Sequence, residues 1–372
     1  MLAVLVPGLA AYAMCRSGPR QAETEWRWRP AAAMAHARFA TGLVSLRDGR
    51  VLACGGGDRA YKPLTSCEIY DPRADRWLPA AAMDRPNGGS LMVRLTDGRV
   101  LAVGGSSPGP DGITAAAIYD PGRDRWTPIA GVPRSATNAS LTALPTGGAI
   151  LVGGSYHGND VFDDTFVLDV TSGEWSAGPS LNLGREAHCA GWTRDGLIVV
   201  GGRGQFETCW PSRWLCLRGG SSPQLASVER WTPGDRQWRR GRASLTPLPY
   251  CHGISLGDNE LLVAADDRSV RYDASRDRWT EIAAPPRSLS HRTLAALPGG
   301  GAVAAGGYPY SGAPSRLASL VIDSGGRAWR WGAPVLRMRT STTAATLLDG
   351  RVMLVGGVDE QGVTASVEIF GP

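Results

Sequence analysis

The chain has 372 residues, of which 43% are hydrophobic and 20% charged, enough for a sizeable buried core. Its 49 glycines and 26 prolines predict many turns and few long helices. The net charge of +5 is dispersed along the chain rather than gathered in a basic run, which argues against a nucleic-acid partner.

The N-terminal segment MLAVLVPGLAAYAM (1–14) is apolar but too short to span a bilayer as a helix. It is typical of the core of a secretory signal peptide, and Ala11-Tyr12-Ala13 is typical of a cleavage site, although the usual preceding positive charges are missing. We therefore expect residues 1–25 to be a leader and linker, and the protein to be exported to the periplasm or secreted. The alternatives are a true start further upstream and a segment that is not a signal. No later segment is apolar enough to cross a membrane.

The chain contains 7 cysteines, and an exported protein would pair some of them. Cys209 and Cys216 flank one loop, and Cys54 and Cys67 lie on either side of an expected hairpin loop that would bring them near each other. Free buried thiols are the competing interpretation, because connectivity cannot be deduced from sequence.

A tryptophan recurs along the chain at intervals of 49, 49, 49, 63, 41 and 50 residues. The recurring residues are Trp28, Trp77, Trp126, Trp175, Trp238, Trp279 and Trp329. Several of them close the same turn, as in YDPRADRW (70–77), YDPGRDRW (119–126) and YDASRDRW (272–279). The Asp-Pro and Asp-Arg pairs in these segments favour a tight turn between two short strands.

A second signature precedes each turn: an apolar strand that ends in two glycines, as in RVLAVGG (99–105) and RVMLVGG (351–357). An Asp-Gly hairpin usually leads into this strand. In the fifth unit Ala264-Ala265 replaces the glycines, and we expect the small pair to let backbone pass beneath a neighbouring tryptophan. Each unit therefore predicts four antiparallel strands.

These combined signatures resemble the kelch repeat, which implies an all-β, seven-bladed kelch-type β-propeller over residues 26–372. The last unit ends at VEIFGP without its tryptophan, whereas Trp28 precedes the first glycine pair. We therefore expect the strand of Trp28 to pair with the last blade and close the ring. Residues 203–224 are an insertion in blade four, whose Trp210 and Trp214 would form a lid or stacking platform, or simply pack the loop.

The resemblance implies that the loops before the first strands and after the glycine pairs share one face at the central channel. Arginines recur in the first set of loops, and such a ring favours an anionic or sugar-like ligand. The equal alternative is that these arginines brace neighbouring blades. The candidate ligand-binding residues are Arg85, Arg134, Asn138, Tyr156, His157, Arg185, Arg287, Tyr308 and Arg337.

Three histidines, His188, His252 and His291, stand near the starts of the first strands in units four, five and six. Converging imidazoles would bind copper, iron or zinc, whereas the alternative is three separate hydrogen-bonded histidines. The segments YCHGISL (250–256) and SHRTLAALPGG (290–300) are similar to two segments of galactose oxidase and related copper radical oxidases. That resemblance implies a tyrosine–cysteine cross-link, with Cys189 at about the required level, but Cys251 interrupts the Tyr-His pair.

We therefore expect one of two functions. The first is a binding or scaffold module that holds a glycan, an anionic small molecule or a protein on its arginine-rich channel face. The alternative is a metal-dependent, copper-type oxidase or a sugar-modifying enzyme that uses His188, His252 and His291.

Overall fold

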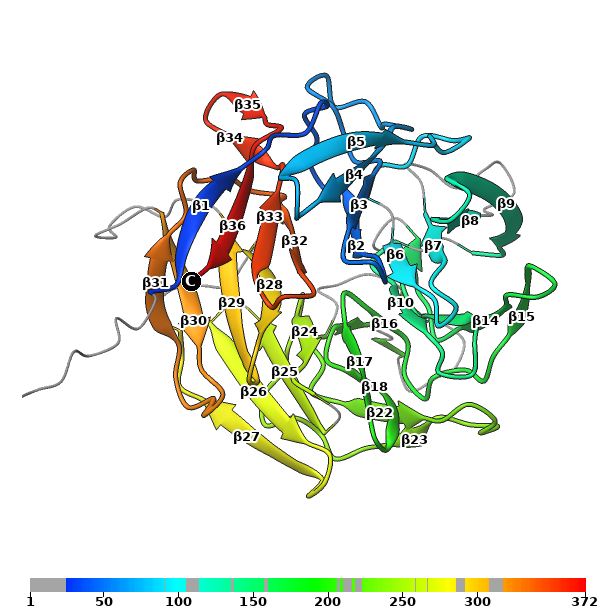
Figure 1. The fold of residues 1–372 in the computed structure, drawn as a ribbon. Coiled ribbons are helices and arrows are strands. Elements are labelled where there is room, and N and C mark those ends of the chain that lie inside the picture. The colour runs from blue at the N-terminus through cyan, green and yellow to red at the C-terminus, as the bar shows by residue number, and fades with distance from the viewer. Residues whose placement is uncertain are drawn as a thin grey trace, which may run out of the picture.

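The computed structural model describes residues 25–89, 91–104, 114–134, 137–156, 160–205, 208–209, 216–217, 223–257, 259–265, 267–285, 292–307 and 317–372. In these ranges the regular structure is entirely β, so they contain no helix that would span a bilayer. Seven four-stranded antiparallel sheets are arranged around a common axis (Figure 1). The predicted seven-bladed β-propeller is thereby confirmed.

Within each blade, the strands follow one another from the centre outwards. Blades one to three contain β2 (Gly42–Ser45), β3 (Val51–Cys54), β4 (Cys67–Asp71) and β5 (Arg76–Ala80); β6 (Leu91–Arg94), β7 (Val100–Val103), β8 (Thr114–Asp120) and β9 (Arg125–Val132); and β10 (Ser140–Ala143), β11 (Ala149–Val152), β14 (Thr165–Asp169) and β15 (Glu174–Ala177). Blades four to six contain β17 (Cys189–Thr193), β18 (Gly196–Val200), β22 (Val228–Trp231) and β23 (Arg239–Arg240); β24 (His252–Ser255), β25 (Glu260–Ala265), β26 (Arg268–Asp273) and β27 (Arg278–Ile282); and β28 (Arg292–Leu297), β29 (Gly301–Gly306), β30 (Ala318–Ile322) and β31 (Arg330–Pro334).

Blade seven combines the two ends of the described chain. It contains β32 (Thr343–Thr346), β33 (Val352–Val355) and β36 (Val367–Gly371), with β1 (Arg27–Ala31) as its outermost strand. Trp28 lies opposite Phe370 in the register, and the two ring centroids are 5.1 Å apart. The innermost strands of all seven blades contact one another in an unbroken circle. The N-terminal strand thus covers what would otherwise be an exposed sheet edge.

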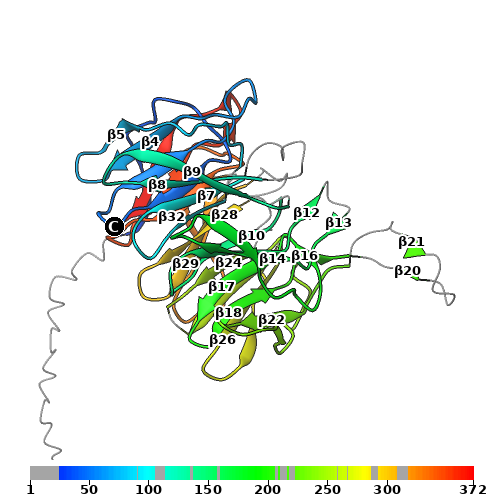
Figure 2. The same cartoon turned by 90° about the vertical axis from the view of Figure 1, so that its right-hand side faces the viewer.

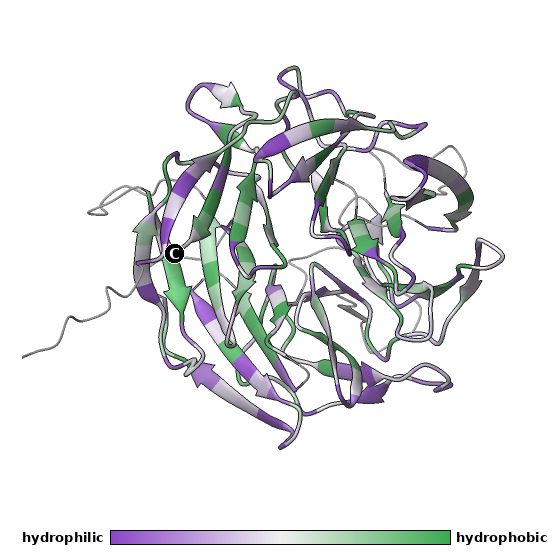
Figure 3. Ribbon diagram, viewed as in Figure 1, coloured by the Kyte–Doolittle hydropathy of each residue, from purple (hydrophilic) through white to green (hydrophobic). Residues whose placement is uncertain are grey.

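The repeated turn sequence has a physical explanation in the contacts of its second aspartate. Asp75 accepts a hydrogen bond from the Tyr70 hydroxyl at 2.7 Å and another from the Ala32 N–H at 2.8 Å. The indole N–H of Trp77 donates to the Ala32 carbonyl at 2.8 Å. This turn therefore ties blade one to the segment that precedes it in the ring, and Asp124 and Trp126 make the same contacts with Ala81 in blade two. The second strands between these ties are buried and hydrophobic along their length (Figure 3).

The glycine pairs are required by the backbone of the following blade. A Cβ atom on Gly55 would lie 2.2 Å from the carbonyl oxygen of Asn87, and Gly55 has a positive φ of 63°. The close neighbour is thus a loop carbonyl, not the tryptophan expected from the sequence. In blade five, the residues that replace the glycine pair lie one position later than expected. Ala264 lies opposite His252, as Cys54, the residue before the glycine pair of blade one, lies opposite Gly42. Ala265 therefore corresponds to the first glycine.

Two disulfides join described cysteines. Cys54–Cys67 links neighbouring strands of blade one, as their positions suggested, with Cα atoms 4.2 Å apart. Cys189–Cys251 links blades four and five, with Cα atoms 5.7 Å apart. β20 (Thr208–Cys209) and β21 (Cys216–Leu217) place the backbones of Cys209 and Cys216 opposite each other, but their side chains lie outside the described part. The lid expectation for Trp210 and Trp214 also falls outside it.

Trp28→Ala tests the contribution of the N-terminal strand to ring closure. Trp28 is only 4% exposed, so its truncation should lower the free energy of unfolding by about 3–5 kcal/mol in urea denaturation. Trp331→Ala is the control, because that side chain is 45% exposed and its loss should cost less. Equal losses in the two variants would contradict a special role for the closing strand.

Candidate functional site at the loop face

Loops that precede the first strands pair with loops that follow the glycine pairs, at one end of the propeller. Backbone bridges join Phe39 to Gly57 and Thr340 to Val358, and in blade four β16 (Arg185–Glu186) pairs with β19 (Arg203–Gly204). In Figure 2, β16 lies on the same side as the hairpin of β12 (Ser155–Tyr156) and β13 (Asp160–Val161), with β20 and β21 projecting beyond. We call this end the loop face. The turns between first and second strands lie at the other end.

The arginines of these loops fall into two structural classes. Arg38, Arg185 and Arg339 are 0–1% exposed, whereas Arg134 and Arg337 have half-exposed side chains and Arg85 is exposed. In blade seven, the buried Arg339 stands two residues after the half-exposed Arg337. In blade one, the buried Arg38 stands two residues after His36, which takes the position of the exposed class. The sequence pattern therefore combined two positions with different roles.

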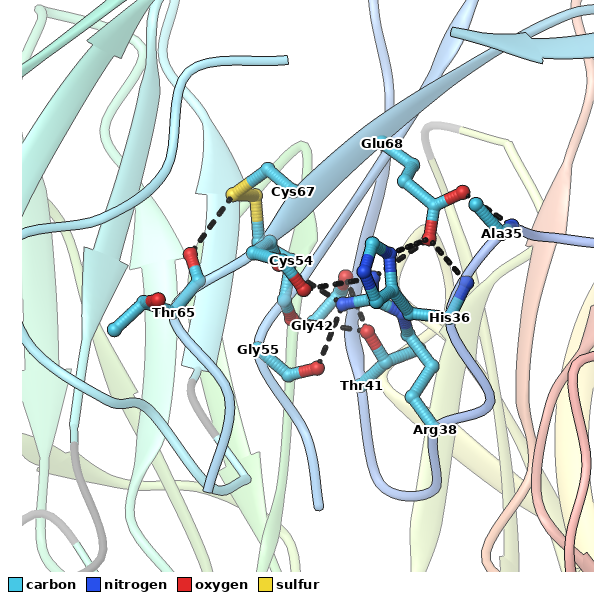
Figure 4. Close-up of polar contacts among 11 residues, drawn as sticks. Ala35, His36, Arg38, Thr41, Gly42, Cys54, Gly55, Thr65, Cys67 and Glu68 are labelled. Atoms are coloured by element: carbon cyan, nitrogen blue, oxygen red, sulfur yellow. Dashed lines mark hydrogen bonds and ion pairs between the residues drawn. A yellow bond between two sulfur atoms is a disulfide. The ribbon is translucent and has the colours of Figure 1, made fainter. Parts of the chain in front are cut away.

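The buried class forms an internal brace, shown for blade one in Figure 4. The Arg38 guanidinium donates to the carbonyls of Gly55 and Ser66, each at 2.9 Å, and to the Glu68 carboxylate at 2.8 Å. Glu68 also accepts the N–H groups of Ala35 at 2.6 Å and His36 at 3.1 Å. Burial lowers the pKa of Arg38, and Glu68 counteracts this effect. Both charges of the buried pair thus have hydrogen-bond partners, although Arg38 Nε has none.

The same brace recurs in blades four and seven. Arg185 binds the Ser227 carbonyl at 3.1 Å and Glu229 at 2.8 Å. Arg339 binds the Ser366 carbonyl at 2.8 Å and Glu368 at 2.7 Å. Arg185, one of the candidate ligand-binding residues, is therefore enclosed and held by its own chain. Its geometry fits the bracing alternative.

Blade five fills the same place with apolar side chains. We call the place of Arg38 in its loop the arginine position and that of Glu68 in its strand the glutamate position. The carbonyl of Arg38 accepts the N–H of Gly357, the second glycine of the preceding blade, at 2.9 Å. Leu248 accepts from Gly202 in the same way at 2.9 Å, so it stands at the arginine position of blade five. Val270 stands at the glutamate position, and both apolar side chains are fully buried. The fold therefore tolerates either a complete ion pair or none at this place.

The half-exposed arginines have acidic neighbours. Arg134 Nε lies 2.8 Å from Asp164 Oδ2, and its guanidinium stacks over the Phe162 ring at 4.8 Å. Arg337 lies 3.6 Å from Asp359. The candidates His157, Arg287 and Tyr308 lie outside the described residues, so the structure leaves their roles as predictions.

A polar cluster joins blades three, four and five around the buried Glu186. This carboxylate accepts hydrogen bonds from Asn138 Nδ2 at 3.0 Å and Ser155 Oγ at 2.5 Å, and lies 3.4 Å from the Arg203 guanidinium. Arg203 also hydrogen-bonds the Tyr250 hydroxyl and stacks on that ring at 5.3 Å. The structure thus brings the predicted Asn138 together with Tyr250. Sequence reasoning passed over Glu186, whose single signal is its place directly after Arg185.

The described histidines do not occupy equivalent places. His252 lies opposite Ala264, as Cys189 lies opposite Val200, so His188 is one position earlier in its blade. His188 is 7% exposed and shares a 2.8 Å hydrogen bond with Ser140, whereas His252 is exposed. His188 lies just before β17, whereas His252 is the first residue of β24, so the two histidines occupy different positions in their blades. His291 lies outside the described residues.

The cysteine positions also disagree with a copper radical site. Cys189 is bonded to Cys251, so its sulfur is not available for a cross-link to tyrosine. Within the described ranges, no three His, Cys, Asp or Glu side chains are grouped to hold a metal ion. Within the described part, His188, His252 and Cys189 are therefore not arranged as the copper site that the resemblance implied, and the role of His291 stays a prediction.

Tyr61 was not singled out from the sequence, yet it is the most exposed aromatic side chain of the described loop face, at 67%. Its ring lies 5.3 Å from that of Phe39, between the paired loops of blade one. Tyr250 at 55% and Tyr156 at 43% are also exposed on this face. Exposure of single tyrosines depends on loop geometry, which no repeat signature encodes.

Substitution of the brace in blade four tests its energetics. Glu229→Val alone should cost about 3–5 kcal/mol because it leaves the Arg185 charge buried without its partner. Adding Arg185→Leu, which copies blade five, should recover part of this loss in urea denaturation. Losses that simply add would contradict the brace.

The buried His188 should make stability depend on pH. Burial, with the positive charge of Arg185 nearby, lowers the pKa of His188 from 6.5 to about 3 in the folded protein. As the pH falls, the unfolded chain therefore takes up the proton first. The contribution of this group is complete above pH 6.5 and is lost toward pH 3, by at most about 1.4 kcal/mol per pH unit.

His188→Gln should flatten the fall in unfolding free energy between about pH 6.5 and pH 4, measured by urea denaturation at several pH values. Leu348→Ala is the control, because this exposed side chain does not titrate and its loss should leave the pH profile unchanged. An unaltered slope in His188→Gln would show that His188 is not the responsible group.

Comparisons with known proteins agree with this architecture. Residues 44–84 match the Kelch motif family model. The chain is 23% identical over 202 residues to the human Kelch repeat and BTB domain-containing protein 12, an alignment that covers 46% of this chain and 30% of the human protein. A fungal alcohol oxidase of the AA5 family, solved in complex with copper, has a TM-score of 0.69 over 93% of this chain and 76% of its own, at 14% identity. The likeness to the oxidase is one of fold. Residues 44–84 thus carry a kelch motif, and they lie in one blade of a seven-bladed β-propeller.

Proposed function

We propose that the protein is a binding scaffold that holds a protein partner on its loop face. The observation that carries this proposal is the exposure of Tyr61, Tyr156 and Tyr250 beside half-exposed arginines on that face. Tyrosine and arginine are the residue types that most often dominate the binding energy of protein interfaces. The rigid propeller holds these side chains on short paired loops, which limits the entropy lost on binding.

Charge balance favours a protein over an anionic small molecule or a glycan as the partner. The half-exposed Arg134 and Arg337 each have an aspartate nearby, and Arg203 faces Glu186. Such pairs offset much of the positive field that would attract a small anion. A protein surface of mixed charge suits this pattern better.

The enzyme alternative receives less support. The copper-type oxidase was predicted to use His188, His252 and His291; the first two occupy different positions in their blades, and the third lies outside the described residues. Cys189, the predicted cross-linking cysteine, is bonded to Cys251. A sugar-modifying activity stays a prediction without supporting geometry. Fold alone does not decide, because the propeller hosts both binding modules and enzymes.

We also propose that the protein acts in an oxidising compartment outside the cytosol. The disulfides Cys54–Cys67 and Cys189–Cys251 support this location, since such bonds persist where thiols are not kept reduced. The leader expectation for residues 1–25 agrees with it but falls almost entirely outside the described part.

The double variant Tyr61→Ala/Tyr250→Ala tests the binding proposal. Full-length protein would capture partners from the supernatant or periplasm of its own host, and the enriched partner would then be purified and titrated. Loss of two exposed tyrosines should weaken affinity about 5- to 30-fold, as expected for about 1–2 kcal/mol of interface energy.

Leu348→Ala is the matched control. Leu348 is 64% exposed but lies in a hairpin turn at the opposite end of the propeller, so affinity should not change. A partner that binds the double variant as tightly as the unmodified protein would place its interface elsewhere.

A further inference from the structure

Blade two lacks the brace. Asn87 stands at the arginine position, because its carbonyl accepts the Gly56 N–H at 2.8 Å. Ala117 stands at the glutamate position, since it lies opposite Ala102 as Glu68 lies opposite Ala53. Both charged partners of the pair are thus replaced by shorter, neutral side chains.

The loop before blade two is otherwise held like the loop before blade one. Met83 N–H donates to Thr65 O at 2.9 Å and Asn87 N–H to Leu64 O at 3.0 Å. In the loop before blade one, the corresponding bonds run from Met34 to Ala365 at 3.0 Å and from Arg38 to Thr364 at 3.3 Å. The N–H groups of Asp84 and Arg85 therefore correspond to those of Ala35 and His36, which bind Glu68 in blade one. Among the described residues, no hydrogen bond uses these two N–H groups of blade two.

A cavity of about 640 Å³ occupies this region of blade two. The residues that line it include the apolar Met83, Trp126 and Ile129. Its polar lining residues are Asp84, Arg85 and Asn87, and Gly104 and Ala115 also line it. Asn87 is 6% exposed, and its buried Oδ1 atom has no hydrogen-bond partner. An unpaired buried acceptor is costly, so it marks a place where a donor belongs.

We propose that this cavity, the blade-two pocket, binds a small zwitterion with a carboxylate next to an ammonium group, as in an α-amino acid with an apolar side chain. Such a head group restores the missing ion pair. Its carboxylate takes the place of Glu68 at the N–H groups of Asp84 and Arg85. The inference concerns a small-molecule site and does not depend on the proposed protein partner.

The acceptors of the pocket match the ammonium group in number. Gly104 O and Ala115 O correspond to Gly55 O and Ser66 O, which accept the guanidinium of Arg38 in blade one. With Asn87 Oδ1 they make three acceptors, and an ammonium group has three N–H donors. The apolar side chain of the ligand packs on Met83, Trp126 and Ile129.

Calorimetric titration of the full-length protein with L-leucine, L-methionine and L-phenylalanine tests the pocket. At least one of these amino acids should bind. Two analogues of L-leucine serve as matched probes: 4-methylpentanoate carries the carboxylate alone, and 3-methylbutylamine carries the ammonium group alone. Each should bind about tenfold more weakly than L-leucine. No binding by any of the three amino acids, or equal binding by a single-charge analogue, would overturn the proposal.

Three variants locate the site. Asn87→Ala should weaken binding about tenfold, because it removes one acceptor of a charged group. The triple variant Asn87→Arg/Ala115→Ser/Ala117→Glu rebuilds the brace of blade one and should abolish binding without lowering the melting temperature. Ala117→Leu, which fills the pocket with an apolar side chain, should also abolish binding and decides the question if the triple variant does not fold.

Tyr61→Ala is the control, because it changes the loop face outside the pocket and should bind the amino acid normally. Unchanged affinity in folded Ala117→Leu would show that the ligand binds elsewhere and would overturn the assignment. Loss of protein capture with intact amino-acid binding would separate the two sites.

Discussion

Closure of the ring places every blade between two neighbours, and the contacts of the protein repeat because of that constraint. In the described loops before blades one, two, four, five and seven, a loop carbonyl lies against the glycine pair of the preceding blade, as Asn87 does against Gly55. The turn aspartate and tryptophan of each typical unit hold the segment before it, as Asp75 and Trp77 hold Ala32. A blade that left this circle would expose its buried second strand and deprive both neighbours of these contacts. Stability is therefore shared around the ring.

Within that circle, one pair of side chains differs between blades while the fold stays the same. It is the pair formed in blade one by Arg38 of the loop and Glu68 of the third strand. The place of these two side chains holds a complete ion pair in blades one, four and seven, two apolar side chains in blade five, and an open cavity in blade two. Each solution avoids an unpaired buried charge, which would cost several kcal/mol. The rest of the loop does not need to change, because its backbone hydrogen bonds come from the neighbouring blade. A repeat protein can thus gain a site in one unit without altering the others.

The fold followed from the sequence because periodic strands, Asp-Gly hairpins and glycine pairs are local signals. The pairing of β1 with β36 was also predictable. The last repeat unit has no tryptophan after Phe370, whereas Trp28 stands before the first unit. The site was less predictable for a geometric reason. Arg38 and Arg85 differ by two positions in the loop, a shift that reverses their exposure but is not evident from the recurrence of arginine. Nor does the sequence show that Cys251 faces Cys189. The insertion at residues 203–224 breaks the repeat period, so the spacing does not tell which residues of blades four and five are equivalent.

The insertion of blade four also lies inside a covalent loop. Cys189 and Cys251 are separated by 62 positions, and the segment between them includes residues 203–224. A protease that cleaves anywhere between the two cysteines would divide the chain in two, yet the disulfide would keep both pieces in one molecule. The two pieces would lose their covalent link only after reduction as well as cleavage. The bond thus allows the insertion of blade four to be cut without release of either half.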